Sequence, residues 1–132
     1  MPKKRFTSGN INSKSDFFVE FIPSITDGIK IDIHSKTSSI HGSKLYNITK
    51  QSLSDLGINY GELSIVDNAG QYFVLQARIE AAVKSSKPKI NVESLCDFKK
   101  HAQYKSSRGR FRRSRLYLPG NQAKLMMNAG IH

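Results

Sequence analysis

The sequence predicts an α+β fold, a compact β-β-α-β-α sandwich with its helices on one face of a small sheet, followed by a basic C-terminal extension. Apolar residues alternate with polar ones over residues 29–34, and aromatic and β-branched residues fill 17–23, as expected of strands. Over residues 43–56 and 73–85 the apolar residues instead recur at helical spacing. Of a net charge of +11, residues 87–132 carry +9, whereas residues 6–86 are close to neutral.

The first two strands are expected at residues 17–23 and 29–34. The segment FFVEFIP ends at Pro23, and in IKIDIH the residues Ile29, Ile31 and Ile33 share one face. Because only the turn Ser24–Gly28 separates the two segments, we expect them to form a hairpin.

Two helices and a third strand follow. The helix over 43–56 has Ser43 as its expected N-cap and Gly57 after its end. A short strand, ELSIV, covers 62–66 and leads into a turn at 67–70. The second helix, 73–85, has four apolar residues on one face: Leu75, Ile79, Ala82 and Val83. Residues 17–86 are therefore expected to form the folded domain.

The two ends have different compositions. Residues 1–16 are polar and basic and predict a flexible arm or loop, whereas 87–111 predict a basic linker. Within 112–132, a strand over 115–118 and a helix over 122–129 are expected. One strand and one helix cannot bury their apolar faces alone, so this end is interpreted as the truncated beginning of a further domain.

Several classes of site are excluded by simple counts. The single cysteine, Cys96, rules out an internal disulfide and a zinc site built on several cysteines, and is interpreted as an inert thiol. The four histidines have no metal-ligand spacing, so no metal site and no catalytic residue are predicted. No apolar run is long enough for a transmembrane helix or a secretory signal, so we expect a cytoplasmic protein without a membrane partner.

The positive charge also raises the hypothesis of a nucleic-acid-binding protein. The run Arg108–Arg115, with Phe111 as a stacking ring, offers phosphate contacts. Because this charge lies outside the expected folded domain, nucleic acid is the less favoured partner, and a basic linker can equally dock on an acidic subunit.

Residues 9–86 resemble the acyl carrier protein, or gamma chain, of citrate lyase. The resemblance starts at Ser8-Gly9, with a serine-containing loop that ends at Asp16, and continues through a strand that ends in Pro23 and an alternating strand. Its most specific part is a V-D-x-x-G turn, here Val66–Gly70, before a helix with the pattern A-R-x-E-A, here Ala77–Ala81.

The resemblance implies a carrier that is not itself catalytic. Such chains hold a prosthetic group, 2'-(5''-phosphoribosyl)-3'-dephospho-CoA, on a serine through a phosphodiester, and carry acetyl and citryl groups as thioesters. The implied partners are the alpha-type and beta-type subunits of citrate lyase, which exchange and cleave the carried acyl group.

The resemblance leaves two serines as candidates for the attachment site. In the family the serine lies two residues before the aspartate, where this chain has Lys14. Ser13 is the favoured site if the loop has one extra residue, and Ser15 is the nearest substitute. A third hypothesis is an assembly domain that has lost its attachment serine.

A second resemblance concerns the C-terminal segment. Residues 112–121, RRSRLYLPGN, are similar to the opening of the citrate lyase beta subunit and its aldolase-like relatives. The resemblance implies a carrier–lyase fusion that contains only the first strand and helix of an incomplete TIM-type barrel, without its metal-binding acidic residues.

Overall fold

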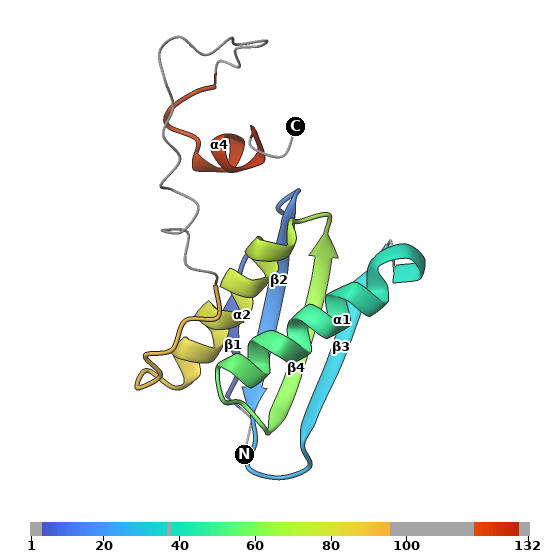
Figure 1. Ribbon diagram of the computed structural model, residues 1–132, viewed down its shortest axis with the longest axis vertical. Coiled ribbons are helices and arrows are strands. Elements are labelled where there is room, and N and C mark those ends of the chain that lie inside the picture. Colours follow the sequence, from blue (N-terminus) through green and yellow to red (C-terminus); the bar gives the residue numbers. More distant parts are fainter. Residues whose placement is uncertain (1–3, 37, 96–117, 130–132) are drawn as a thin grey trace, which may run out of the picture. The chain divides into compact units, whose positions relative to one another are not determined.

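The computed structural model describes residues 4–36, 38–95 and 118–129, in two compact units, Met1–Asp97 and Phe98–His132. The first unit is a four-stranded sheet with two helices in front of it (Figure 1). Its elements are β1 (Phe6–Ser8), β2 (Asp16–Pro23), β3 (Ile29–Ser35), α1 (Ser38–Asp55), β4 (Gly61–Asn68) and α2 (Tyr72–Ser86). The predicted α+β class, with both helices on one face, is confirmed.

The order of the strands is β1-β2-β4-β3, so the predicted hairpin of β2 and β3 is wrong. The strand β4 lies between them, antiparallel to β2 and parallel to β3. Burial gives the physical reason. On the core face, Leu63 and Ile65 of β4 are at most 2% exposed, whereas the isoleucines of β3 are only half-buried. The more deeply buried β4 therefore takes a central position and β3 the edge, and α1 makes the crossover that parallel pairing of β3 and β4 requires.

The strand β1 is absent from the sequence-based expectation, which placed a flexible arm over residues 1–16. The three residues Phe6–Ser8 pair antiparallel with β2, Phe6 opposite Phe21 and Ser8 opposite Val19. A segment of three residues is too short to show a period of two. Its partner β2, rather than its own pattern, holds it at the edge of the sheet.

Both helices bury the faces that their spacing predicted. Leu75, Ile79, Ala82 and Val83 of α2 are fully buried, and Leu45, Leu53 and Leu56 of the α1 region join the same core. The start of α1 differs from expectation, since the helix begins at Ser38 and Ser43 lies inside it. Its end agrees: Gly57 has a φ of +68°, and the Ile58 N–H bonds to the Leu53 carbonyl at 2.8 Å.

The strand β4 is also longer than predicted. It runs to Asn68, so the expected turn at 67–70 begins inside the strand, where Asp67 pairs with Phe17 on one side and Ser35 on the other. The turn is confined to Ala69 and Gly70. Ala69 has a φ of +60°, unusual for a residue with a side chain.

The chain that follows α2 turns back along this helix (Figure 1). Ile90 packs against the core, and the Ser94 N–H donates to the Glu80 carboxylate at 2.8 Å. Glu80 also accepts a 2.7 Å bond from the Lys84 ammonium. Residues 87–95, the start of the predicted basic linker, thus belong to the first unit and are held against its core and α2.

We expect the attachment of this segment to weaken in acid. Burial by itself raises the pKa of Glu80, but the hydrogen bonds from Lys84 and from the Ser94 N–H outweigh it, so the pKa lies below its ordinary value. A carboxyl group whose pKa is lower in the folded state than in the unfolded state adds to the free energy of unfolding. The full contribution is present above the ordinary pKa, and it is lost as the pH falls through the lowered pKa. In an NMR pH titration, the Ser94 amide shift should follow this lowered midpoint, and Glu80→Gln should abolish the transition. A midpoint at or above the ordinary glutamate value would contradict the assignment.

The second unit contributes one described element, the helix α4 (Ala123–Ala129), which agrees with the helix expected at 122–129. Leu118 and Pro119 belong to no strand. Cys96, the basic run Arg108–Arg115 and most of the expected strand at 115–118 lie outside the described residues. The incomplete barrel is therefore not confirmed.

Over the described ranges, no helix is long and apolar enough to cross a bilayer, and no cluster of three or more His, Cys, Asp or Glu side chains is arranged to hold a metal ion.

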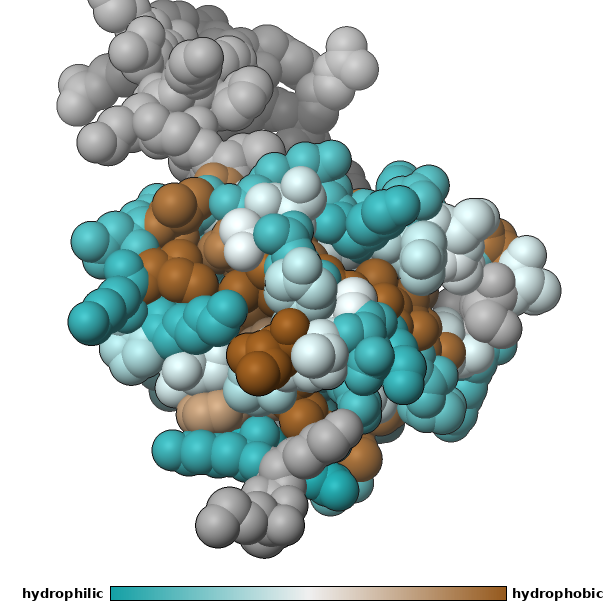
Figure 2. Space-filling view, turned by 90° about the horizontal axis from the view of Figure 1, so that it is seen from below, coloured by the Kyte–Doolittle hydropathy of each residue, from teal (hydrophilic) through white to brown (hydrophobic). Residues whose placement is uncertain are grey.

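Seen from below, apolar residues reach the surface of the first unit in several places between hydrophilic ones (Figure 2). Ile25, in the β2–β3 turn, is the most exposed large apolar side chain in the described part, at 90%.

Candidate functional site

The loop between β1 and β2, residues 9–15, contains both candidate serines, and we call it the attachment loop. It lies at the end of the first unit where β4 finishes and α2 begins (Figure 1). Its backbone is held by an Asx turn, in which Asn10 Oδ1 accepts the Asn12 N–H at 2.9 Å, and by a 3.1 Å bond from the Ser13 N–H to the Asn10 carbonyl.

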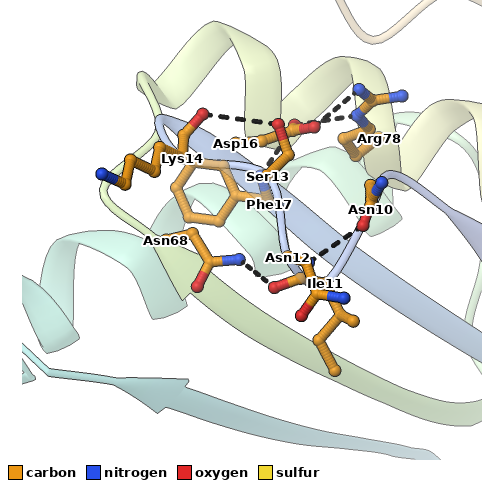
Figure 3. Close-up of polar contacts among 9 residues, drawn as sticks. All are labelled: Asn10, Ile11, Asn12, Ser13, Lys14, Asp16, Phe17, Asn68 and Arg78. Atoms are coloured by element: carbon orange, nitrogen blue, oxygen red, sulfur yellow. Dashed lines mark hydrogen bonds and ion pairs between the residues drawn. The ribbon is translucent and has the colours of Figure 1, made fainter.

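Asn68, the last residue of β4, braces the attachment loop from the sheet. Its side-chain amide donates to the Ile11 carbonyl at 2.7 Å (Figure 3). Its own backbone carbonyl accepts the Ser15 N–H at 2.8 Å. One side chain and one carbonyl of β4 therefore fix the loop at two points on either side of Ser13.

Asp16 and Arg78 fix the point where the attachment loop enters β2. The guanidinium of Arg78 donates two parallel bonds to the Asp16 carboxylate, at 3.0 and 2.9 Å (Figure 3). The Phe17 N–H donates to the same carboxylate at 2.8 Å. Asp16 is buried, so this pairing supplies the partners that a buried charge requires.

The two candidate serines occupy different positions in the attachment loop. Ser13 is partly exposed and lines a surface hollow of about 270 Å³, which Lys14 and Lys36 also line. Ser15 has a φ of +54° and is not among the residues that line this hollow. Its N–H is already hydrogen-bonded to the carbonyl of Asn68 at the end of β4. Both serines thus lie in one loop, but only Ser13 lines the same hollow as the two lysines.

The hollow lies at the carboxyl ends of the parallel strands β3 and β4, the usual position of ligand sites in sheets with parallel strands. Lys36 follows β3, and Asp67 to Ala69 close β4. Asp67 accepts the Ser35 hydroxyl at 2.7 Å and the Ala69 N–H at 2.8 Å, so its carboxylate is engaged on both sides.

Sequence reasoning identified the attachment loop but missed Lys36 and Asn68, and it quoted Arg78 without a role. Asn68 lies beside the attachment loop because β4 pairs with β2, and Lys36 lines the same hollow because β3 pairs with β4. The predicted hairpin of β2 and β3 did not place β4 between them. The strict pattern A-R-x-E-A was the available signal for Arg78, because an arginine on an otherwise apolar helix face requires a partner.

The chain is similar in sequence to known proteins. A family model named ACP and described as "Malonate decarboxylase delta subunit (MdcD)" matches residues 3–86. The citrate lyase acyl carrier protein of Clostridium perfringens is 35% identical over 81 residues, which are 61% of this chain and 79% of that protein. The protein of the same name from Albidiferax ferrireducens is 26% identical over 90 residues, 68% of this chain and 91% of its own length. Through residues 3–86, the chain belongs to the citrate lyase acyl carrier protein family.

Proposed function

We propose that this chain is the acyl carrier of a citrate-lyase-type complex and that Ser13 is its attachment residue. The observation that carries the proposal is the position of Ser13, in a braced loop and at the edge of a hollow lined by Lys14 and Lys36. Two lysines in the lining of the hollow beside Ser13 favour a phosphodiester there, because a phosphate ester is stabilised by cationic side chains that can reach it.

The group proposed is 2'-(5''-phosphoribosyl)-3'-dephospho-CoA. Attachment exchanges the Ser13 O–H bond for an O–P bond: the phosphorus arrives in an activated phosphoanhydride, the anhydride oxygen leaves with the electron pair, and the hydroxyl proton is released. When bound, the group supplies a terminal thiol for acetyl and citryl thioesters. The residues of this chain hold the first phosphate and keep the attachment loop in place, and none of them is proposed to be catalytic.

The proposed partners are alpha-type and beta-type citrate lyase subunits in the cytoplasm. A tethered acyl group meets both sites at a raised effective concentration, and this is the advantage of a carrier over a free thioester. The resemblance of residues 112–121 to a lyase opening supports the further proposal that the carrier is fused to the beginning of a beta-type domain. The nucleic-acid hypothesis rests on residues 108–115 and stays a prediction.

A second candidate concerns the acyl group. The family model that matches residues 3–86 is described as a subunit of malonate decarboxylase, which favours malonyl as the alternative cargo on the same serine. Identifying the acyl group on protein from cells grown with citrate or with malonate distinguishes the two candidates.

The test is peptide mapping of the full chain purified from its native cells. Trypsin cleaves after Lys14, so it places Ser13 in peptide 6–14 and Ser15 in peptide 15–30. We expect an added phosphoribosyl-dephospho-CoA mass on peptide 6–14, complete loss of that mass in Ser13→Ala, and retention in the matched control Ser15→Ala. An adduct on peptide 15–30 would move the site to Ser15. An unmodified chain from cells that make active lyase would favour an assembly domain that has lost its serine.

A further inference from the structure

A second surface hollow adjoins the one beside Ser13. It measures about 350 Å³, and Asp67 and Ala69 line both hollows, so these two residues form the ridge between them. Two hydrogen bonds fix the ridge in place. The Asp67 carboxylate accepts one from the Ala69 N–H and another from the Ser35 hydroxyl of β3. An extended molecule attached at Ser13 reaches the second hollow by crossing this ridge.

The second hollow is lined largely by rings and apolar groups. Phe17, Leu45, Tyr72 and His41 all contribute to it. The rings of His41 and Tyr72 meet edge to face, with centroids 6.5 Å apart, and the Tyr72 hydroxyl lies 3.2 Å from His41 Nδ1. A side chain at Gly70 would bring its Cβ within 2.5 Å of the Phe17 ring, so the glycine keeps the hollow open to that ring. Such a lining suits a flat aromatic base.

The surroundings of the two hollows are positively charged. Lys14 and Lys36 line the first, and the Lys44 ammonium lies 4.4 Å from the centre of the Tyr72 ring beside the second. Among the described residues that line either hollow, Asp67 is the only acidic one, and its carboxylate already accepts two hydrogen bonds. A ligand with an aromatic base and several phosphates therefore matches both the shape and the charge.

We propose that the two adjoining hollows form a binding site for a purine nucleotide, with the base in the hollow of His41 and Tyr72 and phosphates near Lys14 and Lys36. The inference rests on the proposed function, in which the group on Ser13 contains adenosine and phosphates. It adds that the carrier binds the nucleotide part of this group on its own surface, so that only the outer arm swings between partner sites.

A third hollow supplies the matched control. It measures about 370 Å³, is lined by Tyr46 and Lys50 together with apolar residues, and shares no lining residue with the other two. Like the proposed site it has a tyrosine and a lysine in its lining, but it shares no lining residue with the attachment loop. Binding that depends only on a tyrosine next to a lysine would occur in both places.

The experiment is an NMR titration of the full chain, without a group on Ser13, with 3'-dephospho-CoA. We expect the amide shifts of Ala69, Gly70 and Tyr72 to move in a saturable way. Tyr72→Leu should weaken binding about fivefold or more, as loss of base stacking on an aromatic ring does. Lys36→Gln, at an exposed position, should weaken binding severalfold and more strongly at low salt. Tyr46→Leu and Lys50→Gln should leave it unchanged.

Three outcomes would overturn the inference: no saturable shift, equal shifts around Tyr46 and Tyr72, or binding that is unaffected by both Tyr72→Leu and Lys36→Gln. Titrations with adenosine and with inorganic pyrophosphate separate the contributions of the base and the phosphates. The proposed function is tested separately from this inference. Modified Ser13 without nucleotide binding would remove only the present inference, and binding to a chain whose serines are never modified in cells would remove only the carrier proposal.

Discussion

Replacing Arg78 by alanine is expected to lower the free energy of unfolding by about 2–3 kcal/mol and to loosen the attachment loop. The Asp16 side chain is 9% exposed, and Arg78 supplies two of the three hydrogen bonds identified to its carboxylate. Removing one partner of a buried pair leaves a charge with too few partners, and this costs more than the pair itself contributes. The Arg78 side chain is 37% exposed, so water can enter and keeps the loss below the upper range for fully buried pairs.

The measurement is urea unfolding of the full chain, together with amide hydrogen exchange of residues 10–15. Arg5→Ala is the matched control, because Arg5 forms a single exposed contact of 3.4 Å with Glu20 and should cost less than about 0.5 kcal/mol. Arg78→Lys should recover part of the stability but not the two-pronged geometry. Equal losses for Arg5→Ala and Arg78→Ala would show that the Asp16 pairing does not stabilise the loop.

Replacing Gly9 by alanine is expected to cost about 3 kcal/mol or more and to distort the attachment loop at its first residue. Gly9 has a φ of +94°, a region that residues with a side chain rarely adopt. An added Cβ would also lie 2.0 Å from the Phe17 carbonyl oxygen, and this backbone atom cannot move without breaking the pairing of β2. Strain and overlap therefore add at one position.

Gly28→Ala separates these two contributions. Gly28 has a φ of +70° in the β2–β3 turn, but no atom lies within 4 Å of its added Cβ, so only the backbone penalty of about 1 kcal/mol remains. Both variants are compared by urea unfolding, and the attachment loop is followed by the chemical shifts of Asn12 and Ser13. Similar losses for the two glycine variants, with unchanged loop shifts in Gly9→Ala, would show that the loop tolerates a side chain there.

The fold class and the helices could be predicted because they depend on local periodicity. The four residues of α2 that were assigned to the core are all fully buried. Gly57 follows the end of α1 with a positive φ, as its position in the sequence suggested. The pairing of the strands could not be predicted from the same pattern. A five-residue turn between two strands is compatible with a hairpin and also with the insertion of a third strand, and only the deeper burial of Leu63 and Ile65 decides between them.

The site was predictable only in part for the same reason. The attachment loop and its serines are contiguous in the sequence, so the resemblance to a family was sufficient to propose them. Lys36 follows β3, Asn68 ends β4 and Tyr72 begins α2. They lie at the same end of the sheet because β3 and β4 run parallel and α2 starts shortly after β4 ends. No regular spacing in the sequence predicts that these three residues lie at the same end of the sheet.

The order in which the strands are synthesised determines when the loop around Ser13 can take its folded shape. The strand β4 joins β2 to β3, yet it is the last of the described strands to leave the ribosome. Asn68 and Arg78 follow the residues that they brace, Ile11 and Asp16, by 57 and 62 positions. A nascent chain that ends before β4 has at most the hairpin of β1 and β2, which is marginal in water. The loop around Ser13 is therefore braced only after synthesis has passed Arg78 in α2. Under the proposed function, we expect attachment to Ser13 to follow folding of the domain instead of accompanying its translation.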